Sequence, residues 1–256
     1  MNPDRETASI GGLIDERDGN DGPEKTPPEG ESPDRDSYAE GTPLTWVFGD
    51  HPEVKLVAAF LSEQDNLFNK KQAAKLSGVS RPEVPSYLEP MVDCGVIEEC
   101  AQSGNVKLYT LGDSKAVDTL RKLEATLLSR AYEPDSDHPE SSTISDSDAE
   151  SSVDEPYAED TPLTWVFGDH PEAKLVAALL SEPDHQFSIT DWSTVAGLSR
   201  GPVYNHRDRL VDHGIVEDLG KQGRSHKYQL ADNKITKLLR MLETQLLRSW
   251  YENQSR

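Results

Sequence analysis

Residues 196–216 read AGLSRGPVYNHRDRLVDHGIV and carry the signals that decide the fold. Gly197 stops one short helical pattern, and Ser199 stands where a helix N-cap residue is favoured. Apolar residues then recur at helical spacing, and Gly214 occupies the position after the helix where glycine ends helices in a left-handed conformation. The stretch therefore predicts two helices that are joined by a tight glycine turn.

The flanking sequence extends this pair of helices into a larger unit. Two acidic residues three positions apart before an apolar run indicate a helix N-terminus. Polar and apolar residues that alternate next to a glycine-rich turn indicate a β-hairpin. The predicted elements are, in order, a helix whose N-cap is formed by Asp169 and Glu172, a short helix over Thr190–Ala196, the helix capped by Ser199, strands over 215–219 and 226–230 around a turn at 220–225, and a last helix from about Asp232 to Tyr251.

The same unit occurs twice in the chain. The segment TPLTWVFGDHPE spans Thr42–Glu53 and again Thr161–Glu172, and the offset of 119 continues without a gap over 92 aligned positions, of which 43 are identical. A period of this length suits a whole small domain rather than a solenoid repeat. We therefore predict one domain over residues 42–133 and a second over 161–256.

The net charge of −21 is concentrated outside these repeats. Residues 1–41 have a net charge of −8 and residues 134–160 a net charge of −10, and both segments are rich in proline, serine and aspartate. Such segments bury too little apolar surface to offset the entropy of ordering. The sequence predicts a disordered acidic tail over 1–41 and a disordered acidic linker over 134–160.

The residues Ala196–Tyr204 and Leu210–Val216 resemble the turn and recognition helix of MarR-like and ArsR-like regulators, and Phe167–Glu182 looks like haloarchaeal, hence archaeal, members of that group. The resemblance implies a mainly α fold with small β-hairpins, built as two tandem winged helix-turn-helix domains. It also implies a transcriptional regulator that binds double-stranded DNA.

The second repeat carries the residues that such a function needs. A recognition helix presents its N-terminal residues to base edges, and basic side chains contact phosphates. Arg200 and Asn205 are the candidates for base contacts, because these residue types pair with guanine and adenine. The predicted DNA-binding surface comprises Ser199, Arg200, Tyr204, Asn205, Arg209, Lys221, Arg224, His226 and Lys227. The alternative interpretation is that these residues are the solvated faces of a helix and a hairpin.

The first repeat departs from this pattern. Pro85 and Pro90 fall inside its predicted recognition helix, and each removes a backbone donor, so we expect a kinked or shortened helix. Glu83 and Glu89 add negative charge. We expect the first repeat to bind DNA weakly or not at all; the alternative is that basic residues near this helix contact phosphates, namely Lys70, Lys71, Lys75 and Arg81.

The last helix of each repeat has a long apolar stripe that predicts helix pairing. The stripes comprise Val117, Leu120, Leu123, Leu127 and Leu128 in the first repeat, and Ile235, Leu238, Leu239, Leu242, Leu246 and Trp250 in the second. They favour either an intrachain pseudo-dimer of the two repeats or a homodimer of two chains. The alternative is that each stripe belongs to the core of its own domain.

Other notable residues receive a structural interpretation. We expect the aromatic residues of the repeated segment (Trp46, Phe48, Trp165 and Phe167) to pack on their own domains, with a contact across the pseudo-dimer as the alternative. The duplicated Asp-His pairs (Asp50-His51 and Asp169-His170) are interpreted as helix caps, not catalytic residues. Cys94 and Cys100 are expected to be reduced structural thiols rather than a redox or metal sensor.

The sequence excludes several classes of protein. It has no phosphate-binding loop, dinucleotide fingerprint or metal-ligand motif, so we expect no enzyme activity, no cofactor and no metal. No apolar run approaches the roughly 20 residues that cross a bilayer, and the N-terminus has no secretory signal, so we expect a cytoplasmic protein with no membrane partner. The alternative to DNA binding is a protein-interaction adaptor in which the same domains serve as docking modules.

Overall fold

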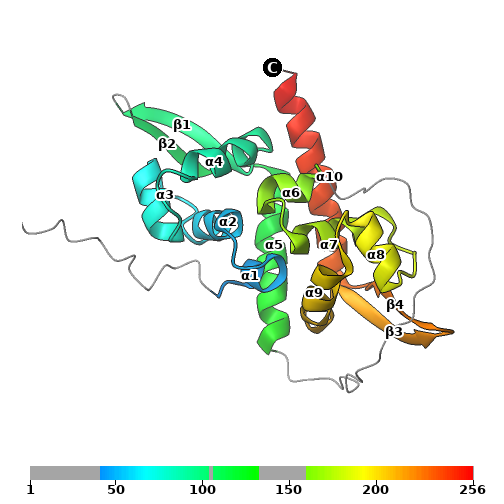
Figure 1. Ribbon diagram of the computed structural model, residues 1–256. Coiled ribbons are helices and arrows are strands. Elements are labelled where there is room, and N and C mark those ends of the chain that lie inside the picture. The colour runs from blue at the N-terminus through cyan, green and yellow to red at the C-terminus, as the bar shows by residue number, and fades with distance from the viewer. Residues whose placement is uncertain (1–40, 104–105, 133–159, 256) are drawn as a thin grey trace, which may run out of the picture. The chain divides into compact units, whose positions relative to one another are not determined.

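The computed structural model describes residues 41–103, 106–132 and 160–255. The predicted disordered tail and linker therefore lie, apart from Gly41 and Asp160, outside the described residues. Within these residues the protein is mostly helical, with two small antiparallel β-hairpins (Figure 1). The elements follow the same order in both repeats.

Each repeat consists of four helices, a hairpin and a long helix. The first repeat contains α1 (Pro43–Phe48), α2 (Pro52–Ser62), α3 (Lys70–Ser77), α4 (Val84–Asp93), β1 (Ile97–Ser103), β2 (Val106–Leu111) and α5 (Lys115–Tyr132). The second contains α6 (Pro162–Phe167), α7 (Pro171–Ser181), α8 (Ile189–Val195), α9 (Arg200–Asp212), β3 (Val216–Gln222), β4 (Ser225–Leu230) and α10 (Lys234–Gln254).

The start of each repeat differs from the prediction. The short helices α1 and α6 were not predicted from the sequence, although each begins with a proline, which is favoured in the first turn of a helix. The expected cap of α7 by Asp169 and Glu172 is wrong. His170 is the N-cap residue, its side chain makes no capping hydrogen bond, and Glu172 lies inside the first turn.

The turn between α8 and α9 follows the prediction. Gly197 has a φ of 66°, and Ser199 is the N-cap residue of α9 in an extended conformation, although its side chain makes no capping hydrogen bond. Gly214 follows α9 with a φ of 69°, which is the left-handed conformation expected there. The sequence therefore placed both ends of α9 correctly, because glycine readily adopts the positive φ that the chain needs before and after this helix.

The corresponding helix of the first repeat, α4, is shortened as expected. It begins at Val84 and has 10 residues, whereas α9 has 13. Pro85 lies in the first turn of α4, where the lost N–H has no helical partner, so its predicted position inside the helix is wrong. Pro90 does lie inside the helix.

The second hairpin is longer than predicted. β3 continues to Gln222 and β4 begins at Ser225, so the turn consists of Gly223 and Arg224 rather than residues 220–225. The strand pairing shifts between Asp218 and Lys221, and the carboxylate of Asp218 accepts a hydrogen bond from the amide of Gly220 at 2.7 Å. Because of this irregularity, polar and apolar residues do not alternate at the end of β3, and the sequence predicted a turn there.

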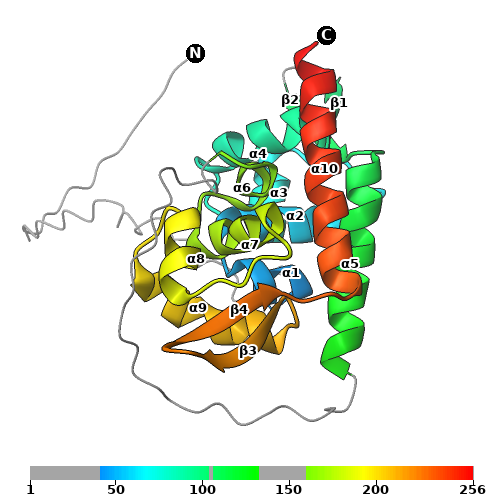
Figure 2. The ribbon, with the colours of Figure 1, turned by 90° about the vertical axis from the view of Figure 1, so that its right-hand side faces the viewer.

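The two long helices pack against each other in antiparallel orientation (Figure 2). Thr119 near the start of α5 donates a hydrogen bond to Gln245 in the second half of α10, at 2.7 Å. The predicted pairing residues are buried, apart from the half-buried Trp250 and from Leu128, which is 42% exposed and therefore does not belong to the packed stripe.

The contact between repeats continues through the duplicated segment. The rings of Phe48 and Phe167 stack with centroids 3.9 Å apart, and both are fully buried. The expectation that each aromatic residue packs on its own repeat is wrong for this pair, and also for Trp46, whose ring stacks on His213 of the second repeat with centroids 6.0 Å apart. Residues of both repeats thus belong to one hydrophobic core, while the hairpins β1–β2 and β3–β4 lie at opposite ends of the paired repeats (Figure 1).

Candidate nucleic-acid interface

The first half of α9 presents polar side chains to solvent. Val203 and Leu210 are fully buried and fix the helix on the core. The opposite face carries Ser199, Tyr204 and Asn205, all exposed, with Arg200 half-buried at the start of the helix. Four of the predicted DNA-binding residues therefore lie at the start of α9, between its N-cap residue and Asn205.

Arg207 connects α9 to the hairpin. Its guanidinium lies 5.3 Å from the ring centroid of Tyr204 and 5.8 Å from that of Tyr228, and it donates a hydrogen bond to the Tyr228 hydroxyl at 3.0 Å. The first repeat has the buried Leu88 at this position. Arg207 thus departs from the apolar residue that the first repeat has at this position. The structure explains it, because Tyr228 of β4 supplies both a hydroxyl and a ring face for the charged group.

The hairpin turn contributes two of the predicted cations. Lys221 and Arg224 are exposed at and beside the turn. The other two predicted residues of this hairpin are engaged with the protein. Lys227 lies 3.5 Å from the Asp191 carboxylate of α8 and donates to the Gln186 carbonyl at 3.4 Å, and His226 is half-buried 3.5 Å from Asp218.

Arg209 lies apart from the other predicted residues. It donates to the Glu172 carboxylate at 2.6 Å, and its Nε is buried without a hydrogen-bond partner. Its guanidinium therefore packs toward α7 and is not part of the exposed face of α9. Its predicted role as a phosphate contact gains no support from this geometry.

Glu172 is the centre of a small ionic cluster. Besides Arg209 it accepts from His51 of the first repeat, at 3.3 Å, and lies 3.4 Å from His206 of α9. Burial acts to raise the pKa of this carboxyl, but a backbone hydrogen bond, Arg209 and the two histidines lower it below its usual value. Burial lowers the pKa of His206.

The two repeated histidines meet between the repeats. The rings of His51 and His170 stack with centroids 3.6 Å apart and an interplanar angle of 9°. His170 lies 3.2 Å from the Glu53 carboxylate, so each histidine pairs with a glutamate of the opposite repeat. The sequence interpretation of these histidines as helix caps missed this cross-pairing.

The equivalent face of the first repeat is more acidic. Glu83 and Glu89 are exposed at the start of α4 and within it. Lys107 on β2 of this repeat pairs with Glu99 on β1 at 2.8 Å. This cation is therefore neutralised by its own hairpin.

The exposed face of α9 also carries acids in its second half. Asp208 and Asp212 are exposed, and Asp208 lies 3.1 Å from the Arg207 guanidinium. The basic residues of the candidate surface therefore lie at the start of α9, with Arg200, and at the hairpin, with Lys221 and Arg224.

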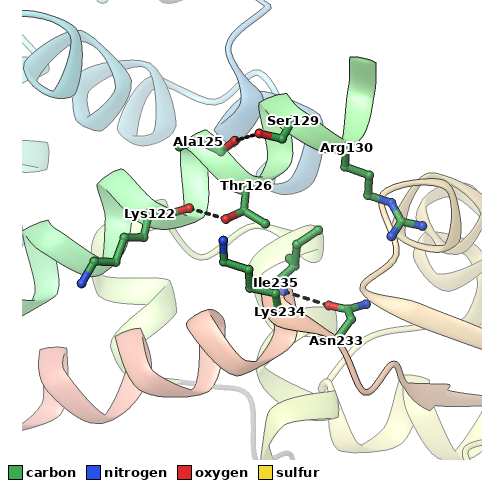
Figure 3. Close-up of a pocket in the computed structure, with 8 residues that line it drawn as sticks. All are labelled: Lys122, Ala125, Thr126, Ser129, Arg130, Asn233, Lys234 and Ile235. Atoms are coloured by element: carbon green, nitrogen blue, oxygen red, sulfur yellow. Dashed lines mark hydrogen bonds between the residues drawn. The ribbon is translucent and has the colours of Figure 1, made fainter. Parts of the chain in front are cut away.

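A groove of about 420 Å³ lies where the end of α5 meets the start of α10 (Figure 3). Lys122, Arg130 and Lys234 contribute cations to its lining. Asn233 caps α10 by accepting from the amides of Ile235 and Thr236. The lining belongs to the contact between the repeats and not to the face that contains Arg200 and Arg224.

Several other properties bear on function. Cys94 is buried and Cys100 exposed, and neither forms a disulfide. Among the described residues no group of three or more His, Cys, Asp and Glu side chains is arranged to hold a metal ion. None of the described helices is long and apolar enough to cross a membrane. A scan of protein-family models and a search of curated proteins both find no match.

Proposed function

We propose that the protein is a DNA-binding transcriptional regulator with two tandem winged helix-turn-helix domains, and that the second domain binds duplex DNA. The observation that carries the proposal is the contact between α9 and the β3–β4 hairpin, in which Arg207 of α9 donates a hydrogen bond to Tyr228 of β4. Arg200, Tyr204 and Asn205 stand on α9, and Lys221 and Arg224 on the hairpin. A helix in the major groove flanked by a basic hairpin fits this arrangement.

The proposal assigns two kinds of contact. Arg200 and Asn205 reach base edges, since their side chains make bidentate hydrogen bonds to guanine and adenine. Lys221 and Arg224 contact phosphates and supply affinity that does not depend on sequence. Arg209, His226 and Lys227 are left out of the DNA contacts, because they are engaged in ion pairs within the domain or buried.

The first domain serves as the pairing partner in this proposal. The stacked phenylalanines and the α5–α10 contact join it to the second domain within one chain, which favours an intrachain pseudo-dimer over a homodimer. Its own helix α4 is short, and Glu83 and Glu89 lie on it or beside it. The protein would then read one DNA half-site per chain in the cytoplasm.

One observation favours the alternative function of a protein-interaction adaptor. The acids Asp208 and Asp212 occupy the second half of the exposed face of α9, where they would repel phosphates. Under this alternative the exposed Tyr204 anchors a protein partner. The DNA measurement that follows separates the two functions.

The test is selection from a pool of random-sequence duplexes at several KCl concentrations up to the molar range, with circular dichroism to confirm folding. The wild type is expected to enrich a short motif. Arg200→Ala/Asn205→Ala is expected to lose preference by roughly 5- to 150-fold per base pair read, whereas the control Lys71→Ala/Arg81→Ala in the first repeat retains it. Absence of duplex binding by the folded wild type would favour the adaptor.

A further inference from the structure

We propose that Glu172 is a positioning residue, which holds α9 in its binding orientation and ties that orientation to the contact between the repeats. The inference deepens the proposed function and rests on it for its DNA readout. The side chain of Glu172 is only 6% exposed, yet it lies outside the candidate DNA surface.

Glu172 joins three separate elements. It belongs to α7, and it accepts from Arg209 at 2.6 Å and lies near His206 at 3.4 Å, both on α9. It also accepts from His51, the N-cap residue of α2 in the first repeat, at 3.3 Å. One buried carboxylate therefore links α9 to the opposite repeat.

The surrounding charges make this link strong. One terminal nitrogen of Arg209 donates to Glu172, and its Nε is buried without a partner, so Glu172 is the carboxylate that compensates the charge of the guanidinium. Removal of one member of a partly buried ion pair leaves the other desolvated and unpaired. A neutral side chain at 172 should therefore release α9 from α7 and from the interface.

The first repeat provides an internal control. Glu53 occupies the equivalent position and pairs with His170 at 3.2 Å. The equivalents of His206 and Arg209 are Tyr87 and Pro90, and proline has no side-chain donor. The histidine contact between repeats is thus symmetric, whereas the connection to the helix through an arginine belongs to the second repeat.

The difference between the repeats in this ion pair matches their difference in the proposed DNA contacts. The repeat whose helix carries Arg200 and Asn205 is the repeat whose helix is fixed to the interface. Because His51 and His170 stack on each other, a displacement of one repeat changes the hydrogen bond that Glu172 accepts. The position of the first repeat would then influence DNA binding without contacting DNA.

The test compares Glu172→Gln with the matched control Glu53→Gln in the full-length chain. Amide hydrogen exchange localises the effect, since it measures opening of individual segments. We expect faster exchange in α9 for Glu172→Gln and unchanged exchange there for Glu53→Gln. Arg209→Lys, which retains the charge, should restore most of the protection that Arg209→Gln loses.

The DNA readout uses a double-mutant cycle. His51→Gln should weaken duplex binding on the order of 10-fold in the wild-type background, and much less when Glu172 is already Gln. Equal effects in both backgrounds, or unchanged exchange in α9 for Glu172→Gln, would overturn the inference. If α9 exchange responds as expected but the wild type binds no DNA, the positioning role stands and the proposed function fails.

Discussion

The stack of Phe48 on Phe167 provides a quantitative test of the packing between the repeats. Both rings are fully buried and their centroids are 3.9 Å apart. We consider the two single substitutions Phe48→Leu and Phe167→Leu and the double substitution. Leucine keeps most of the apolar volume, so that the chain remains folded while the aromatic contact is lost.

The expected magnitudes follow from the geometry. Replacement of one apolar side chain by another of similar volume costs up to about 1.5 kcal/mol, and a buried aromatic pair contributes about 0.5–1.5 kcal/mol beyond its buried area. Each single variant should therefore lose about 0.5–3 kcal/mol. The aromatic term disappears in either single variant and cannot be lost twice, so the double variant should lose about 0.5–1.5 kcal/mol less than the sum.

The measurement is urea denaturation of the four proteins at one fixed salt concentration, followed by circular dichroism. Phe187→Leu is the control, because this ring is also buried in the second repeat but contacts His185. The losses of unfolding free energy for Phe187→Leu and Phe48→Leu should add in the double variant, because the effects of distant substitutions add within about 0.3–0.5 kcal/mol. Additivity of Phe48→Leu with Phe167→Leu would refute the contact between the repeats.

Three further outcomes are expected. Burial raises the pKa of Glu243 to about 7 from 4.5; because the folded state holds this proton more tightly, stability should fall as pH rises from about 4.5 to 7, by up to about 3 kcal/mol. Glu243→Gln should flatten that dependence in urea titrations across pH, and an unchanged profile would refute this assignment. Burial also raises the pKa of the Cys94 thiol to about 12, so a thiol reagent at neutral pH should modify only Cys100 in the native chain and both in urea; rapid native modification of two thiols would contradict the structure. Arg207→Ala removes the contact with Tyr228 and should raise hydrogen exchange in β4, whereas unchanged exchange would show that the pair is dispensable.

The duplicated segment illustrates what the sequence allowed and what it did not. The turns at Gly197 and Gly214 and the shortening of α4 were predicted correctly, because glycine alone readily adopts a positive φ and proline fixes φ and lacks an N–H. The pairing of His51 with Glu172 depends on how two repeats meet, which no local pattern specifies. One signal was present: all twelve residues Thr42–Glu53 recur unchanged, as expected where the same patch lies on both sides of a twofold contact.

The candidate surface was predicted in part for a similar reason. Residue type and spacing identified the exposed residues at the start of α9, since the buried Val203 fixes which side faces solvent. Sequence spacing gave no means to see that Arg209 points to Glu172 or that Lys227 points to Asp191. Both partners are distant in sequence. The sequence alone does not distinguish a basic residue that pairs with a carboxylate of the protein from one that contacts a phosphate.

The most direct test of DNA binding by the second repeat is the salt dependence of affinity for a mixed-sequence duplex. Each phosphate contact contributes about 0.9 to the slope of log affinity against log salt. If Lys221 and Arg224 each contact one phosphate, Lys221→Gln/Arg224→Gln should reduce the slope by about 1.8, and Lys71→Gln/Arg81→Gln should leave it unchanged. Equal slopes for all three folded proteins, or no binding by the wild type, would contradict the account.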